Sequence, residues 1–121
     1  MDNYLFEHIL DLKINEVKMH INLKVDEKVY YTDEIKAIYK TLNLDDVKQL
    51  ENLTKHKLVK TKDILEGCKN LNKVTVKDKH KVTMFDAKTF YDFSTKKLAC
   101  EELLQDCAEL KDKLLDKELQ F

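Results

Sequence analysis

Residues 62–93 have the sequence KDILEGCKNLNKVTVKDKHKVTMFDAKTFYDF, and this stretch decides the predicted fold. It begins with apolar residues at helical spacing, from Ile64 to Leu71. Two segments follow, 74–76 and 82–85, in which apolar and polar residues alternate around the turn Lys77-Asp78-Lys79-His80-Lys81. Helix, strand, polar turn and strand is the order of a recognition helix followed by a β-hairpin wing.

The segment 14–25 permits two interpretations. Its apolar residues extend a helical stripe that consists of Phe6, Leu10, Ile14, Val17 and Ile21. Yet residues 17–25 also alternate between apolar and polar, as a half-buried strand does. The unbroken alternation favours a strand over residues 17–25, which the β-prone residues 29–31 could join as a second hairpin.

Helices are expected between and after these strands. Thr32 is a suitable N-cap for one helix and Asp45 for the next, and Thr61 or Asp63 could cap a third. The C-terminal segment 95–120 carries apolar residues at three-and-four spacing opposite a charged face. This pattern predicts an amphipathic helix of about seven turns.

The predicted fold class is therefore α+β. At 121 residues the chain is short enough for one compact domain. We expect a winged-helix-like domain of helices and a β hairpin over residues 1–97. A long amphipathic helix over residues 98–121 would follow it and either pack on that domain or dimerise.

Short motifs support the winged-helix interpretation. They are Tyr4-Leu5-Phe6 with Ile9, Tyr31-Thr32-Asp33-Glu34-Ile35, Lys73-Val74-Thr75-Val76, and Phe90-Tyr91-Asp92-Phe93 before Leu103-Leu104. In these motifs, over about residues 4–104, the chain resembles the winged helix of the transcription factor IIE beta subunit. The resemblance implies a domain that binds DNA or docks onto other transcription proteins.

Composition limits the class of protein. Hydrophobic residues make up 43% of the chain and charged residues 37%. The hydrophobic content is high enough for a core and too high for a disordered tail. No apolar run is long enough to span a membrane, and no secretory signal opens the chain. The odd number of cysteines matches no disulfide framework, so we expect an intracellular protein of cytosol or nucleus.

The residue types also limit the chemistry. The chain has no Pro, no Trp and one Gly, and all 22 of its basic residues are Lys. We interpret this bias as the mark of an AT-rich coding sequence, such as that of a virus, a phage, a parasite or an AT-rich bacterium. Without Arg there is no guanidinium to grip guanine in bidentate fashion, although Lys still neutralises phosphates.

No motif for catalysis or for metal binding occurs. The four histidines are scattered and none has the spacing of a zinc ligand. There is no nucleophile elbow, no glycine-rich phosphate loop and no Cys–His signature. We therefore expect a protein that is not an enzyme and that has no cofactor, no metal and no small-molecule substrate.

Charge is unevenly distributed along the chain. Residues 1–47 and 98–121 each carry a net charge of −4, whereas residues 48–97 carry thirteen Lys and six acids, a net charge of +7. Seven lysines around the third helix and the wing turn are the candidate phosphate contacts: Lys55, Lys57, Lys60, Lys62, Lys77, Lys79 and Lys81. The alternative is that they form a solvated, functionless face.

The leading functional prediction is a non-enzymatic protein that binds duplex nucleic acid or acts in transcription. The alternative is a viral or phage-type module that binds a host protein through the acidic C-terminal helix. The candidate partner or homodimer interface is the apolar stripe of that helix, which consists of Cys100, Leu103, Cys107, Leu110 and Leu114. The same stripe could instead belong to the core of its own domain.

Overall fold

The structure is a computed structural model that describes residues 2–74 and 87–119, and side-chain environments within residues 2–67 and 88–117. Its elements are α1 (Asn3–Ile21), α2 (Val25–Tyr39), α3 (Leu44–Val74) and α4 (Ala87–Leu119). No strand occurs among the described residues. The predicted α+β fold is therefore wrong, because the described chain is all-α.

Helix α1 has a clear start and an unusual end. The Asp2 carboxylate caps its N-terminus by accepting a hydrogen bond of 2.7 Å from the Leu5 N–H. At its C-terminus the Lys24 N–H donates to the Met19 carbonyl at 2.9 Å and the Leu23 N–H to the His20 carbonyl at 3.2 Å. This bond pair closes the helix as a Schellman motif, with Leu23 at a φ of 57°.

The strand predicted over residues 17–25 is thus helix, turn and the start of α2. Val17 lies in the core, but Ile21, Leu23 and Val25 are exposed. The alternation in the sequence therefore does not define one buried face. The helical interpretation of this segment was the correct one, because Val17 continues the buried stripe of α1.

The β-prone residues 29–31, predicted to be the second strand of a hairpin, are helical and belong to α2. Thr32, which was predicted to cap a later helix, lies inside α2 as well. The Thr32 hydroxyl lies 3.0 Å from the Lys28 carbonyl one turn earlier and 2.7 Å from Glu16 Oε2 of α1. Because α1 and α2 are joined by a short turn, they pack as an antiparallel pair.

Helix α3 merges the two helices predicted from Asp45 onward. Asn43 and Asp46 cap it reciprocally: the Asp46 N–H donates to Asn43 Oδ1 at 2.8 Å and the Asn43 N–H to Asp46 Oδ2 at 3.2 Å. Thr61, a predicted cap, is buried inside α3, where its hydroxyl donates to the Lys57 carbonyl at 2.7 Å. A threonine that satisfies its own hydroxyl in this way does not end a helix.

The wing prediction and the resemblance to the transcription factor IIE beta subunit are not supported. Val74 of the first predicted wing strand is the last residue of α3, and residues 75–86 lie outside the described residues. Residues 90–93, another motif of the resemblance, lie within α4. A winged helix needs paired strands, and the described chain has none.

The C-terminal helix is confirmed over residues 95–119, and it begins earlier than predicted, at Ala87. The expected boundary between residues 97 and 98 falls inside this continuous helix. Its length of 33 residues corresponds to about 50 Å at the usual helical rise.

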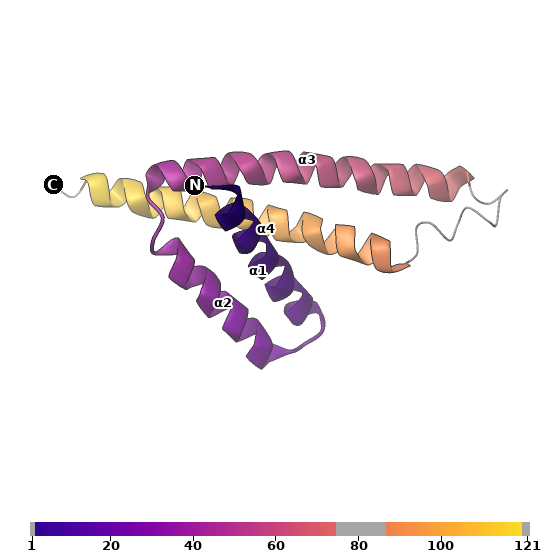
Figure 1. Cartoon of the computed structure of the whole chain (residues 1–121), viewed down its shortest axis with the longest axis horizontal. Helices are drawn as coiled ribbons and strands as arrows, with labels where there is room; N and C mark the ends of the chain where they lie inside the picture. The colour runs from indigo at the N-terminus through magenta and orange to yellow at the C-terminus, as the bar shows by residue number, and fades with distance from the viewer. Residues whose placement is uncertain (1, 75–86, 120–121) are drawn as a thin grey trace.

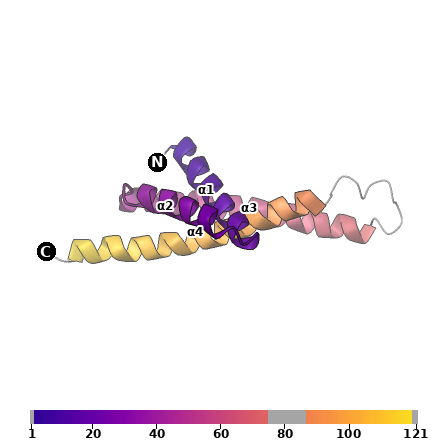
Figure 2. The ribbon, with the colours of Figure 1, turned by 90° about the horizontal axis from the view of Figure 1, so that it is seen from below.

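The helices form two antiparallel pairs. Helix α3 packs along α4 over most of its length, and α1 packs on both α2 and α4 (Figure 1). In both views one end of the α3–α4 pair extends well beyond α1 and α2 (Figure 2). The core lies where three of the helices meet, and its buried cluster consists of Phe6, Ile9, Leu10, Leu42, Val47, Leu50, Cys100, Leu103 and Cys107.

Candidate functional site

The four predicted phosphate contacts that the structure describes all lie on α3, and two of them form no ion pair with another described side chain. Lys55 Nζ lies 3.3 Å from Glu51 Oε1, and Lys57 Nζ lies 3.5 Å from Glu7 Oε1 on α1. Lys60 and Lys62 are exposed and make no ion pair with a side chain in the described ranges. Lys60 and Lys62 are therefore better placed than Lys55 and Lys57 to meet an external phosphate.

The lysines of α3 do not share one face. Lys55 and Lys62 are separated by two helical turns and lie on one side of the helix, whereas Lys57 and Lys60 lie on the other. Lys77, Lys79 and Lys81 fall within residues 75–86, which the structure does not describe. Their predicted role stays a prediction.

Helix α4 supplies lysines that the candidate set did not include. Lys88 is exposed and Lys96 half-buried, and neither makes an ion pair with another described side chain. Both belong to the segment 48–97 whose positive charge was evident from the sequence. Their proximity to α3 was not evident, because the sequence predicted a β hairpin between the two helices.

We call residues 60–97 the basic arm. It comprises the end of α3, the start of α4 and the residues that join them, and it carries ten Lys and five acids, a net charge of +5. The described parts of the arm form the end of the α3–α4 pair that extends beyond α1 and α2 (Figure 1). The start of α4, which belongs to the arm, thus lies at the opposite end of that helix from its acidic C-terminal half.

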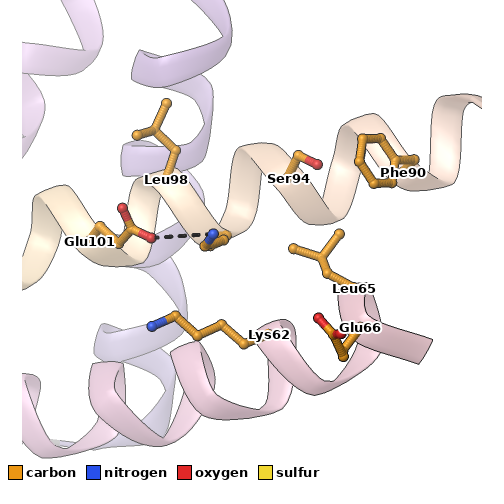
Figure 3. Close-up of a pocket in the computed structure, with 8 residues that line it drawn as sticks. Lys62, Leu65, Glu66, Phe90, Ser94, Leu98 and Glu101 are labelled. Atoms are coloured by element: carbon orange, nitrogen blue, oxygen red, sulfur yellow. Dashed lines mark ion pairs between the residues drawn. The ribbon is translucent and has the colours of Figure 1, made fainter. Parts of the chain in front are cut away.

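A cavity of about 420 Å³ lies between the two helices of the basic arm. Leu65 on α3 points toward α4 on the side of Phe90, whereas the Leu98 side chain points away from α3 (Figure 3). Lys62 and Glu101 lie at the edge of the cavity. Its charges are balanced, since two lysines and two glutamates line it, and Lys97 Nζ lies 3.9 Å from Glu101 Oε1. Nothing in this lining favours an anion, so the cavity itself offers no site for a phosphate.

The predicted partner interface lies largely inside the molecule. Cys100, Leu103 and Cys107 have no exposed surface, whereas Leu110 and Leu114 are half-buried against the same core. Burial raises the pKa of the Cys100 thiol to about 11 and of the Cys107 thiol to about 12. Both thiols are therefore protonated near neutral pH and are poor nucleophiles.

A charged cluster joins α1, α2 and α4. Lys13 Nζ lies 3.0 Å from Glu16 Oε1 and 2.9 Å from Asp106 Oδ2, and the Tyr39 hydroxyl donates to the same Asp106 oxygen at 2.8 Å. Burial alone would lower the pKa of Lys13, but hydrogen bonds to Asp106 and Glu16 raise it above its ordinary value. Burial and the Asp106 charge raise the pKa of Tyr39 as well.

The ion pairs of this charged cluster keep the Lys13 ammonium group protonated. A lysine with a raised pKa stays protonated and cannot act as a nucleophile or base near neutral pH. Among the described residues, no group of His, Cys, Asp and Glu side chains is arranged to hold a metal ion. In the same ranges, no helix combines the length and apolar character that a membrane span requires.

Comparisons with protein-family models, with curated proteins and with solved structures found no match to this chain.

Proposed function

We propose that this protein is a non-enzymatic nucleic-acid-binding protein whose basic arm contacts the phosphates of a duplex. The observation that carries the proposal is the antiparallel pairing of α3 with α4. This pairing brings lysines from two distant parts of the sequence to one protruding end of the molecule (Figure 1). When exposed lysines neutralise phosphates, the counterions condensed on the nucleic acid are released. This release is the main source of non-specific affinity for nucleic acid.

The arrangement supports binding without strong sequence preference. The exposed lysines point to different sides of the arm, so they contact phosphates separately rather than read a row of base edges. The chain has no Arg for bidentate contact with guanine. Affinity should therefore depend on salt much more than on sequence.

The proposal is tested by fluorescence anisotropy of a labelled duplex of about 20 base pairs, titrated at several salt concentrations. The variant Lys60→Ala/Lys62→Ala/Lys96→Ala should weaken binding equally for unrelated sequences. Its log–log salt slope should become shallower by about one unit for each phosphate that the variant no longer neutralises. The variant Lys77→Ala/Lys79→Ala/Lys81→Ala tests the remaining predicted phosphate contacts in the same way.

A matched control removes three lysines from elsewhere in the molecule. Lys36→Ala/Lys40→Ala/Lys113→Ala makes the same change in net charge at exposed positions in α2, just after α2 and in α4. It should leave both affinity and salt slope nearly unchanged. If the arm variant and the control variant lose equal affinity for the duplex, net charge alone drives the binding and the proposal is refuted. The proposal is also refuted if the native chain shows no salt-dependent binding to the duplex.

The second candidate is a protein-binding module. The apolar stripe of the C-terminal helix, which was its predicted interface, is mostly core, so Leu103→Asp should unfold the chain. The feature that favours a protein partner is instead a lysine-bordered apolar groove between α2 and α4. Its geometry leads to a separate proposal.

A further inference from the structure

A groove of about 340 Å³ lies between α2 and the C-terminal half of α4. Its apolar floor comes from Tyr39 and Leu42 on one side and from Leu110 and Leu114 on the other. These four side chains belong to the core or pack against it, so the floor is held in place. Helix α2 packs mainly on α1 and diverges from α4, which leaves the floor open (Figure 1).

Two pairs of lysines border this floor. Lys36 and Lys40 stand at the C-terminal end of α2, and Lys113 and Lys117 stand on α4; all four are exposed. The lysines of each pair are four residues apart, which places them on the same side of their helix about 6 Å apart along its axis. The floor therefore lies between two short rows of positive charge.

These lysines have no partners within the described part of the chain. None of the four makes an ion pair or hydrogen bond with another described side chain. Glu16 and Asp106 line the adjoining cavity of about 350 Å³, but both are engaged by Lys13. Glu109 lines that adjoining cavity and not the groove itself.

We propose that the groove between α2 and α4 is a docking site for an acidic amphipathic helix of a partner protein. The apolar stripe of such a helix would cover the floor, and its carboxylates would face the two lysine rows. The proposal does not depend on nucleic-acid binding by the basic arm, because the two surfaces share no residue.

Charge and spacing together favour this occupant. An amphipathic helix repeats its flanking residues every four positions, which is the spacing of Lys36 with Lys40 and of Lys113 with Lys117. Nucleic acid would meet the lysines but would leave the apolar floor uncovered. A basic or uncharged helix would cover the floor but would bury or oppose unpaired ammonium groups, which costs free energy.

The probe is a fluorescein-labelled peptide of about 15 residues with leucines along one helical stripe and glutamates on both flanks. Binding to the full chain is followed by anisotropy. Lys113→Glu/Lys117→Glu should weaken it by at least about tenfold. The matched control Lys60→Glu/Lys62→Glu, with the same charge change on the basic arm, should leave it unchanged. Circular dichroism verifies that both variants remain helical.

Two further peptides separate shape from charge. A peptide of the same composition, scrambled so that no leucine stripe remains, should bind at least about tenfold more weakly. A peptide with Lys in place of each Glu should fail to bind the native chain and should bind the variant Lys36→Glu/Lys40→Glu/Lys113→Glu/Lys117→Glu. Hydrogen exchange with the first peptide bound should show new protection in residues 36–42 and 110–117.

Three outcomes would overturn the proposal. If the scrambled peptide binds with the same affinity as the first peptide, general electrostatic attraction explains the binding. Protection confined to other segments would place the site elsewhere. Light scattering could show that the chain forms a dimer without peptide. If charge reversal at Lys113 and Lys117 then dissociates this dimer, a second copy of the chain covers the groove.

Discussion

Leu23 occupies a position where helices usually place a glycine. It is the residue after the C-cap of α1, with a φ of 57°, and its side chain is 84% exposed. A Cβ at positive φ meets the neighbouring carbonyl, at a cost of about 1–2 kcal/mol. The exposed side chain contributes little burial to offset that cost. This one residue explains why the end of α1 was missed, since the sequence lacks the glycine that normally marks it.

Replacing Leu23 with Gly should therefore stabilise the protein. The relief of the left-handed conformation exceeds the added entropy of glycine in the unfolded chain, so we expect a net gain of roughly 0.5–1 kcal/mol. Urea denaturation followed by circular dichroism measures it. The matched control is Asn22→Gly, where φ is −85° and glycine has no advantage. A loss of stability in Leu23→Gly would contradict this account of the turn.

At the scale of elements, the long helices α3 and α4 bury small and hydroxylated residues. Ala99 and Cys100 on α4 have no exposed surface, nor does Thr54 on α3. The Thr54 hydroxyl donates to the Leu50 carbonyl at 2.7 Å, so it is satisfied within its own helix. Such residues let two helices approach closely without leaving a buried polar group unpaired.

The variant Ala99→Leu should destabilise the fold. A larger side chain at a fully buried site must push the helices apart or adopt a poor rotamer, at a cost of about 1–3 kcal/mol. Ala108→Leu on the same helix is the control, because Ala108 is exposed and the change there should be nearly neutral. Thermal unfolding of the two variants measures the contrast. Equal melting temperatures would show that the packing at Ala99 is loose.

At the scale of the whole molecule, the charged cluster around Asp106 links the α1–α2 pair to α4 through an ion pair and a hydrogen bond. Its partners are Lys13 on α1 and Tyr39 on α2, whereas Asp106 itself lies on α4. A buried charge that keeps its partners orients the helices that carry it, and removal of one partner is costly. The groove between α2 and α4 depends on this link, because Tyr39 forms part of its floor.

Asp106→Ala should lower the free energy of unfolding by about 3 kcal/mol, because it deprives Lys13 of one carboxylate and Tyr39 of its acceptor. Asp112→Ala, at an exposed position of the same helix, should change it by less than about 0.5 kcal/mol. Chemical denaturation provides both values. Since the pKa of Lys13 is raised, the effect should be fully present below its ordinary pKa of 10.5 and should fade as pH rises through the higher folded value. Similar losses in both variants would refute the role of the cluster.

Local patterns in the sequence were sufficient for the C-terminal helix and for the uneven charge. The apolar repeat of residues 95–119 fits one period only, and charge can be counted without a fold. They also placed Lys60 and Lys62, but not Lys88 and Lys96, among the candidate phosphate contacts, because the segment before Lys88 was interpreted as a wing. Phosphate contact by any of the four stays a prediction. The alternation over residues 17–25 was misleading, because the same residues satisfy a helical stripe.

Only the tertiary structure decided between the helical stripe and the strand-like alternation of residues 17–25. Val17 fits both periods, and its burial beside α4 selects the helix, which no property of residues 17–25 could reveal. It likewise decided that Cys100, Leu103 and Cys107 are core, and that lysines of α2 and α4 border one groove. The physical reason is that burial and proximity arise from contacts between distant segments, whereas periodicity records only what each segment can do by itself.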